Sequence, residues 1–170
     1  NNVSYMIRLG EFFRQANKVS EALAILEDAT KLAPGNANAW ANLGAVFQQD
    51  KKTDAAKMAY EKALAINPNS AVIWSNLGSF AKDAGDLDSA LQYFQKSVEI
   101  QPDLAETHNN LGAMLKVLGR LEEAEASLRQ AIALKPDFTE AHYNLGNMLR
   151  ELGKSKDAEA SYRKAIALKP

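Results

Sequence analysis

The sequence predicts an all-α protein, a right-handed α-solenoid of five stacked helix-turn-helix units. The first observation is the regular spacing of prolines and glycines. All five prolines and eight of the nine glycines recur every 34 residues along the 170-residue chain. The prolines are Pro34, Pro68, Pro102, Pro136 and Pro170. The glycines form two series, one at Gly10, Gly44, Gly78, Gly112 and Gly146 and the other at Gly85, Gly119 and Gly153. We therefore expect repeats at 3–36, 37–70, 71–104, 105–138 and 139–170 of a single array over residues 1–170, and we expect this array to be a fragment of a longer chain.

The second observation is helical periodicity on both sides of the second glycine in each unit. In the fourth unit the apolar residues at helical spacing are Leu111, Met114, Leu115 and Leu118 before Gly119, and Ala124, Leu128, Ala131 and Ile132 after it. Glycine at this place supplies the left-handed residue that ends the first helix, and Asn17 can replace it in the first unit. Lys51 stands there in the second unit, so either Lys51 has a positive φ or that turn has another shape.

Acidic pairs follow the proline turns of the last two units. Asp103 with Glu106, and Asp137 with Glu140, have the spacing of residues that cap the start of a helix. We expect each pair to begin the first helix of its unit.

Composition excludes several classes of partner. Twenty basic residues against 21 acidic ones give a net charge of −1, so we expect no nucleic-acid partner. No run approaches the roughly 20 apolar residues that cross a bilayer, so we expect no membrane insertion. The absence of cysteine leaves the compartment open, with a slight preference for the cytoplasm.

The repeat carries a specific signature. The second unit has Trp40, Leu43, Gly44, Phe47, Ala56, Tyr60 and Pro68, and the third has Trp74, Leu77, Gly78, Ala81, Ala90, Phe94 and Pro102. This pattern, W-x2-L-G-x2-Y then A-x3-F then P, resembles the tetratricopeptide repeat family, and the likeness covers essentially the whole chain. His108 and His142 replace the tryptophan in the last two units. The resemblance implies a concave groove lined by the first helix of each unit.

Four asparagines form a column on the expected groove face. Counted from the first residue of each repeat, position 6 is occupied by Arg8, Asn42, Asn76, Asn110 and Asn144. Adjacent first helices are expected about 10 Å apart, and an extended chain rises about 3.3 Å per residue. Successive asparagines would therefore contact peptide residues three positions apart. An amide can pair with both the C=O and the N–H of a peptide unit. The repeat arm of the O-linked N-acetylglucosamine transferase family is similar in having an asparagine ladder that holds protein substrates.

Further residues are expected beside this column. Positions 5 and 12 contribute Ser75, Asn109, Lys82, Lys116 and Arg150, and the three basic residues could pair with acidic side chains of a partner. The alternative for the asparagines is a tolerated polar position of the repeat, and the alternative for the basic residues is solvation. Position 5 contains no lysine, unlike the co-chaperone domains that clamp a terminal carboxylate.

No residue pattern indicates catalysis. The two histidines would lie about 10 Å apart, too far to share a metal ion bonded at about 2 Å, so we expect packing residues and no cofactor or metal. The aromatic residues Trp40, Trp74, Phe80, Tyr60 and Phe94 occupy packing positions, and we expect them in the core.

The sequence therefore predicts a non-enzymatic protein–protein interaction module that binds an extended protein or peptide segment in its groove. One alternative is a structural scaffold that self-assembles as a homo-oligomer through its ends, where Tyr162, Ile166 and Leu168 should be partly bare. Another is the substrate-recruiting arm of a larger glycosyltransferase.

Overall fold

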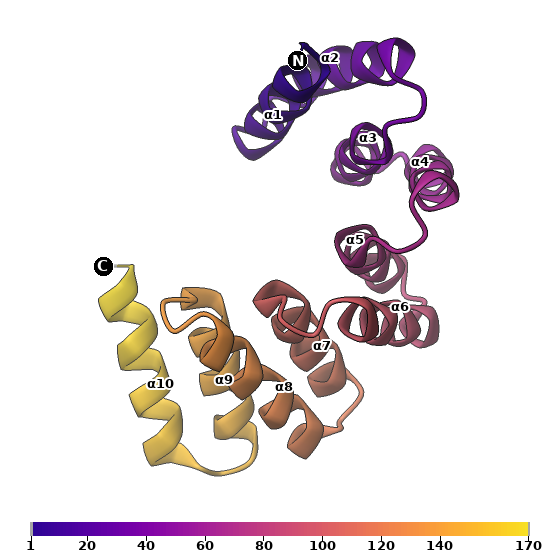
Figure 1. Cartoon of the computed structure of the whole chain (residues 1–170). Coiled ribbons are helices and arrows are strands. Elements are labelled where there is room, and N and C mark those ends of the chain that lie inside the picture. Colours follow the sequence, from indigo (N-terminus) through magenta and orange to yellow (C-terminus); the bar gives the residue numbers. More distant parts are fainter. Residues whose placement is uncertain (1, 170) are drawn as a thin grey trace. The chain divides into compact units, whose positions relative to one another are not determined.

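The computed structural model describes residues 2–169, which fold into paired helices (Figure 1). Within these residues there are ten α-helices and no strand. Their bounds are α1 Asn2–Gln15, α2 Val19–Leu32, α3 Ala37–Gln49, α4 Thr53–Ile66, α5 Ala71–Asp83, α6 Leu87–Ile100, α7 Ala105–Val117, α8 Leu121–Leu134, α9 Thr139–Glu151 and α10 Ser155–Leu168. Each odd-numbered helix is the first helix of a repeat and each even-numbered helix is the second.

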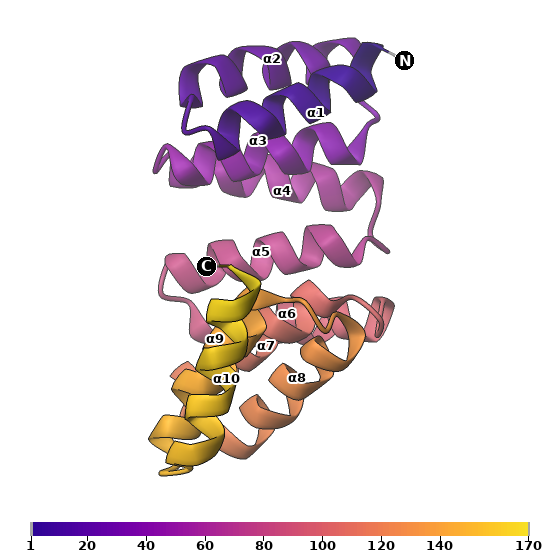
Figure 2. The same ribbon diagram turned by 90° about the vertical axis from the view of Figure 1, so that its left-hand side faces the viewer.

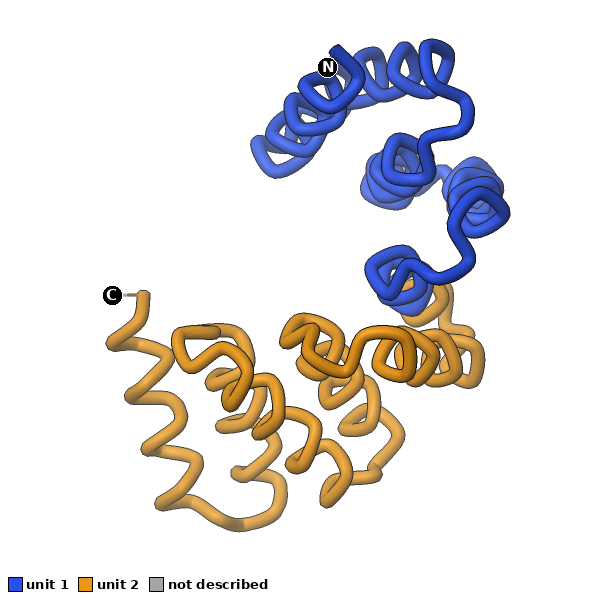
Figure 3. The backbone as a smooth tube through the Cα atoms, in the orientation of Figure 1, with its two compact units in different colours: residues 1–80 blue, residues 81–170 orange. Residues whose placement is uncertain are grey.

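The chain divides into two compact units, residues 1–80 and residues 81–170 (Figure 3). Unit 1 contains α1 to α4 and most of α5, and Figure 2 shows α1 to α4 lying side by side. Unit 2 contains the last residues of α5 and all of α6 to α10. Inside unit 2, α7 contacts both its partner α8 and the next first helix, α9.

The turns inside the repeats have the predicted left-handed residue. Gly85, Gly119 and Gly153 have φ of 83, 73 and 71°, and Asn17 has φ of 57°. Lys51 has φ of 59°, which decides between the two shapes left open for its turn. The repeat geometry therefore holds a lysine in a conformation that costs about 1–2 kcal/mol for a residue with a Cβ atom.

The predicted acidic caps are wrong. Helix α7 begins after Leu104 and α9 begins after Phe138, and neither of these N-cap residues has a side-chain capping bond. Only the residue directly before a helix can cap it, and Asp103 and Asp137 lie one residue too early. The structure instead caps α3 with Asn36 and α6 with Asp86, whose side chains accept 3.1 Å bonds from the N–H of Ala39 and of Ser89.

Small residues let the two helices of a repeat approach closely. A Cβ atom on Gly112 would lie 2.7 Å from Leu128 Cγ and 3.2 Å from the carbonyl oxygen of Ala124. On Gly44 it would lie 3.0 Å from the Tyr60 ring. The alanines at position 20 are buried, with exposed fractions of 0% at Ala22, Ala56, Ala90 and Ala124 and 3% at Ala158.

Tryptophan and histidine at position 4 make the same contact. Trp40 and Trp74 donate from Nε1 to the carbonyl of the proline six residues earlier, at 2.9 and 2.8 Å. His108 and His142 place Nε2 2.7 and 3.0 Å from the equivalent carbonyl. Histidine therefore keeps a ring nitrogen at the proline turn, as expected for a packing residue. The other predicted core aromatics, Tyr60, Phe80 and Phe94, are buried, whereas the two tryptophans are half-buried.

Candidate functional site

Position 6 of the first helices forms two asparagine faces, one in each unit. The unit 1 asparagine face is Asn42 on α3 and Asn76 on α5, and the unit 2 asparagine face is Asn110 on α7 and Asn144 on α9. All four side chains are half-buried. Each of these residues is thus partly enclosed by protein and partly exposed.

In unit 1 the Asn42 amide bonds to its own helix. Its Nδ2 donates a 2.9 Å hydrogen bond to the carbonyl oxygen of Asn38, one turn earlier on α3. Such a local bond leaves the second N–H of the amide group and its carbonyl oxygen for other contacts. Neighbouring helices take no part in this bond.

In unit 2 a buried amide bridges two first helices. Asn144 Nδ2 donates to Asn109 Oδ1 at 2.9 Å, and Asn109 Nδ2 donates to Glu140 Oε1 at 3.1 Å. Asn109 lies on α7 with 1% of its surface exposed, whereas Glu140 and Asn144 lie on α9. Asn109 therefore joins α7 to α9 and fixes the orientation of the Asn144 side chain.

The expectation that Ser75 and Asn109 line an open surface is wrong, because they are 7% and 1% exposed. On α3 and on α7, position 5 faces the next first helix of the same unit. Ala41, at the same position of α3, packs in one cluster with Ile73 of α5, just as Asn109 contacts α9. This position is therefore part of the contact between repeats.

The predicted basic residues lie at position 12, all in unit 2. Lys82 and Lys116 are half-buried and Arg150 is exposed. Lys116 Nζ lies 2.8 Å from Glu151 Oε1 on the next first helix, so this lysine already has an acidic partner. Arg150 is the most accessible of the three.

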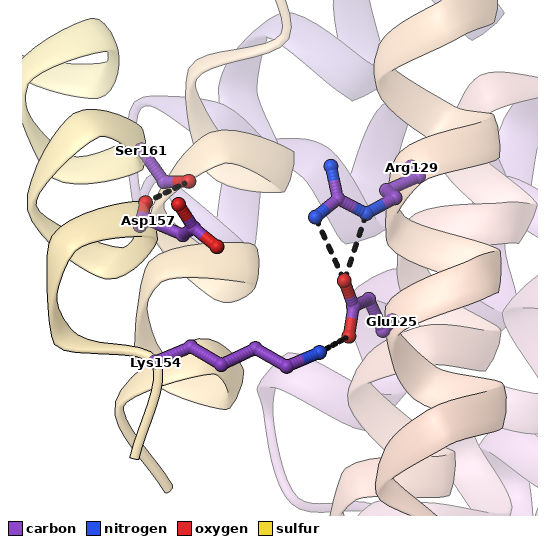
Figure 4. Close-up of polar contacts among 5 residues, drawn as sticks. All are labelled: Glu125, Arg129, Lys154, Asp157 and Ser161. Carbon is purple, nitrogen blue, oxygen red and sulfur yellow. Dashed lines mark hydrogen bonds and ion pairs between the residues drawn. The ribbon is translucent and has the colours of Figure 1, made fainter. Parts of the chain in front are cut away.

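A second polar cluster, which the sequence did not single out, links α8 to the turn before α10 (Figure 4). Glu125 accepts bonds from Lys154 Nζ at 2.7 Å and from Arg129 Nε and Nη2 at 2.9 and 2.7 Å. These hydrogen bonds, that of Lys154 first, hold the pKa of Glu125 below its ordinary value. On α10, Ser161 Oγ donates to the Asp157 carbonyl at 3.0 Å. The signal available in the sequence was a glutamate four residues before an arginine.

Other surfaces offer little for chemistry. A shallow hollow of about 390 Å³ between α8, α9 and α10 is lined by residues that include Arg129, Ile132, His142 and Lys164. Among residues 2–169, no three acidic or histidine side chains gather closely enough to hold a metal ion. No helix in this described part has the length and apolar character needed to span a bilayer.

Family models establish the class of the protein. Models described as tetratricopeptide repeat match residues 37–70, 69–137 and 115–170, and together they span residues 37–170. The chain belongs to the tetratricopeptide repeat family. Such repeats serve as protein–protein interaction modules, and this is the general function that the family supports. A comparison with curated protein sequences found no match.

Solved structures confirm the predicted solenoid fold. PilW, a widely conserved type IV pilus biogenesis factor, is 27% identical with a TM-score of 0.85, over 98% of this chain and 77% of PilW. A thermophilic tetratricopeptide repeat protein of Thermus thermophilus is 24% identical with a TM-score of 0.86, over 99% and 92% of the two chains. YrrB, a tetratricopeptide repeat protein with an unusual peptide-binding site, is 25% identical with a TM-score of 0.67, over 97% and 85%.

Proposed function

We propose that the protein is a non-enzymatic interaction module whose unit 2 asparagine face, Asn110 and Asn144, holds an extended peptide segment of a partner protein. The observation that carries this proposal is the buried Asn109 bridge, which fixes the Asn144 amide before any partner arrives. A side chain that is already ordered loses little conformational entropy on binding. Asn144 therefore provides a prearranged amide for a peptide backbone.

The Asn144 amide has hydrogen-bonding capacity left for a ligand. A primary amide has two N–H donors and one carbonyl acceptor, and the bond to Asn109 uses one donor. The other donor can meet a peptide C=O, while the carbonyl oxygen can accept from a peptide N–H. Such contacts recognise the backbone of a partner irrespective of its side chains.

The spacing of first helices suits an extended chain. Packed helices lie about 8–10 Å apart, which three residues of an extended peptide span at about 3.3 Å each. Asn110 on α7 and Asn144 on α9 would then contact peptide units three residues apart. Arg150 on α9 is exposed and would meet an acidic side chain of the same segment.

A relative supports this assignment by likeness. YrrB has a peptide-binding site, and the two chains are similar over nearly the whole length of this protein. We assign the same class of ligand to this chain and place its binding site at the asparagine face of unit 2.

The test is a screen of short peptides against the wild-type chain and the Asn110→Ala/Asn144→Ala variant. A matched control, Gln92→Ala/Gln130→Ala, removes two exposed amides from the second helices α6 and α8. Circular dichroism checks that all three proteins are folded. A hydrogen bond contributes about 0.5–1.5 kcal/mol net, so losing two amides should weaken a micromolar complex about tenfold or more.

The outcomes separate function from inherited repeat pattern. Peptides that bind the wild type and the glutamine variant but not the asparagine variant support the proposal, and their shared sequence begins to identify the partner. Equal binding to all three proteins, or no binding at all, would overturn it.

A further inference from the structure

We propose that a hollow between α8, α9 and α10 binds an acidic peptide segment of a partner protein and encloses a tryptophan side chain of that segment. We call it the His142 hollow, and its volume is about 390 Å³. Its lining includes Arg129 and Ile132 of α8, His142 and Leu145 of α9, and Ala160 and Lys164 of α10, all in unit 2. The site uses none of the four asparagines, so the inference goes beyond the proposed function.

The hollow lies where other repeats have a tryptophan. Position 4 is Trp40 in the second repeat and His142 in the fifth, and both rings bond to the carbonyl of the proline six residues earlier. An imidazole ring is smaller than an indole ring, so the exchange leaves space at this position. Position 22 changes in the same direction, from Met58 to Ala160. The volume is in the range of ligand pockets, about 300–1,000 Å³, and has room for one aromatic side chain.

The lysine that lies over the tryptophan is kept in the fifth repeat, although the tryptophan is not. In the second repeat, inside unit 1, Lys62 Nζ lies 4.3 Å from the centre of the Trp40 ring, which is a cation–π contact. Lys164 has the same position 26 in the fifth repeat and lines the hollow. It has no acidic partner among residues 2–169. An indole ring from a partner would restore the contact that this lysine makes in the second repeat.

Arg129 adds a second positive charge to the lining. Position 25 of the repeat before the tryptophan is Glu27, whereas position 25 of the repeat before His142 is Arg129. Arg129 Nε and Nη2 donate to Glu125, which also accepts from Lys154 (Figure 4). Two cations therefore share one carboxylate, and the Nη1 hydrogens of Arg129 remain for a ligand.

Charge complementarity identifies the ligand as an acidic segment. The described residues that line the hollow include two cations, Arg129 and Lys164, and no carboxylate. The same lining has apolar surface, because Leu145 is buried and Ile132 is half-buried. A tryptophan would use the apolar surface while neighbouring carboxylates pair with the two cations.

The open side of the second helices is found throughout the array. Position 26 is exposed in all four repeats that another repeat follows: Asp28, Lys62, Lys96 and Gln130. Position 22 is exposed in the same four repeats: Ala24, Met58, Gln92 and Ala126. A following repeat therefore leaves this side of a second helix uncovered, and the exposure of Ala160 and Lys164 does not depend on where the sequence ends.

The hollow and the unit 2 asparagine face lie on different sides of α9. His142 and Asn144 are two residues apart, which is about 200° around the helix axis. A peptide in the hollow therefore need not contact the asparagines, and the two sites can be tested separately.

The test uses three dye-labelled peptides. The first is an N-acetylated pentapeptide amide with one tryptophan between two pairs of glutamates. The second has lysines in place of the glutamates, and the third has serine in place of the tryptophan. Fluorescence anisotropy measures affinity, and nuclear magnetic resonance follows the ring signals of His142. We expect the first peptide to shift these signals and the other two to bind about tenfold more weakly or less.

Two variants with matched controls locate the site. His142→Trp fills the hollow with the residue of the second repeat, which makes the same bond to a proline carbonyl, so the protein should fold and lose binding. His108→Trp makes the same exchange one repeat earlier and should bind as the wild type does. Lys164→Glu should weaken binding about tenfold, whereas Lys62→Glu, at position 26 of the second repeat, should not. Circular dichroism checks folding.

The Asn110→Ala/Asn144→Ala variant separates this inference from the proposed function, because it should bind the acidic peptide like the wild type. No binding of that peptide, equal binding of any two of the three peptides, or unchanged binding to His142→Trp would overturn the inference. If the asparagine variant loses the acidic peptide while His142→Trp keeps it, the hollow is not the site and the asparagine face is.

Discussion

Unit 1 turns its first helices with Asn17 and Lys51 at φ of 57 and 59°, whereas unit 2 uses Gly85, Gly119 and Gly153. The backbone path is the same in both units, because the residue after each turn bonds to an equivalent carbonyl: Lys52 N–H donates to Phe47 O and Arg120 N–H donates to Leu115 O, both at 2.9 Å. The repeat therefore fixes the backbone shape of the turn. The residue type at this place determines only the free-energy cost of the left-handed conformation.

Position 5 also has different residues at equivalent places, and here the difference affects the proposed binding site. Ala41 in unit 1 packs in one apolar cluster with Ile73, whereas Asn109 in unit 2 bonds Glu140 and Asn144. Both residues are buried in the same kind of contact between first helices. One exchange of alanine for asparagine thus couples the repeat contact to the asparagine face, and this distinguishes Asn109 on α7 from Ala41 on α3.

The largest expected effect concerns the close approach of the two helices in a repeat. In Gly112→Ala the new Cβ meets Leu128 and the carbonyl of Ala124, and the backbone oxygen cannot turn away. We expect a loss of about 1–3 kcal/mol in urea unfolding, partly offset by the better helix propensity of alanine. Gly35→Ala is the control, because nothing lies within 4 Å of its added Cβ atom. Equal stability of the two variants would contradict this packing argument.

Asn109→Ala converts position 5 of unit 2 to the residue of unit 1. The change removes the bridge to Glu140 and Asn144, and both partners can then turn toward water. We expect unfolding free energy to fall by about 1–2 kcal/mol and the affinity for a selected peptide to fall several-fold, although Asn109 is too buried to touch the peptide. Calorimetric titration measures the affinity. An unchanged affinity would refute the positioning role of Asn109.

A buried hydroxyl pair is another polar contact between repeats in unit 2. Ser97 and Thr107 place their oxygens 3.0 Å apart, where the first two repeats have Ala29 and Ala39. Ser97→Ala should cost about 1 kcal/mol, because Thr107 loses a partner in a dry site. Adding Thr107→Ala should lose less than the sum of the two single changes, as a double-mutant cycle measures. Strict additivity would exclude coupling.

Many features of the fold were predictable because they depend on local spacing. Proline and glycine at one period indicated the repeat, and the positive φ of Gly119 and Asn17 followed from their place at a helix end. The helix starts were less accurate, because a capping residue is useful only at one position and Asp103 lies one residue before it. Local patterns indicate a helix better than its first residue.

The candidate site was only partly predictable. The asparagine column is visible from periodicity, but the burial of Asn109 depends on how α9 packs over α7, and a helical wheel of one repeat does not contain that information. The contact of Glu125 with Lys154 joins residues 29 apart in sequence and is equally invisible to local spacing.

A stabilising change sharpens the comparison of turns. Lys51→Gly places the unit 2 residue in the unit 1 turn and removes the left-handed penalty, while the unfolded chain gains entropy. We expect a net gain of about 0.5–1 kcal/mol in unfolding free energy, read from the urea midpoint. Lys52→Gly, outside the left-handed position, should not stabilise. A loss on Lys51→Gly would mean that the lysine side chain contributes contacts of its own.

The smallest expected effect concerns pH. The bonded Glu125 has a lowered pKa in the folded protein, so its contribution is present above the unfolded-state pKa and is lost as pH falls through the folded value. Glu125→Gln should therefore reduce the loss of stability on acidification. It should leave the pH dependence of stability near neutral pH unchanged. Thermal unfolding across acidic pH measures this, and an unchanged pH profile would exclude Glu125 as a contributor.

The most direct test of the unit 2 asparagine face is the nuclear magnetic resonance spectrum of the side-chain amides during titration with a selected peptide. We expect the NH2 signals of Asn110 and Asn144 to shift, while those of Gln92 and Gln130 on the second helices stay in place. Shifts confined to the glutamines, or to residues of α10, would contradict peptide binding at this face.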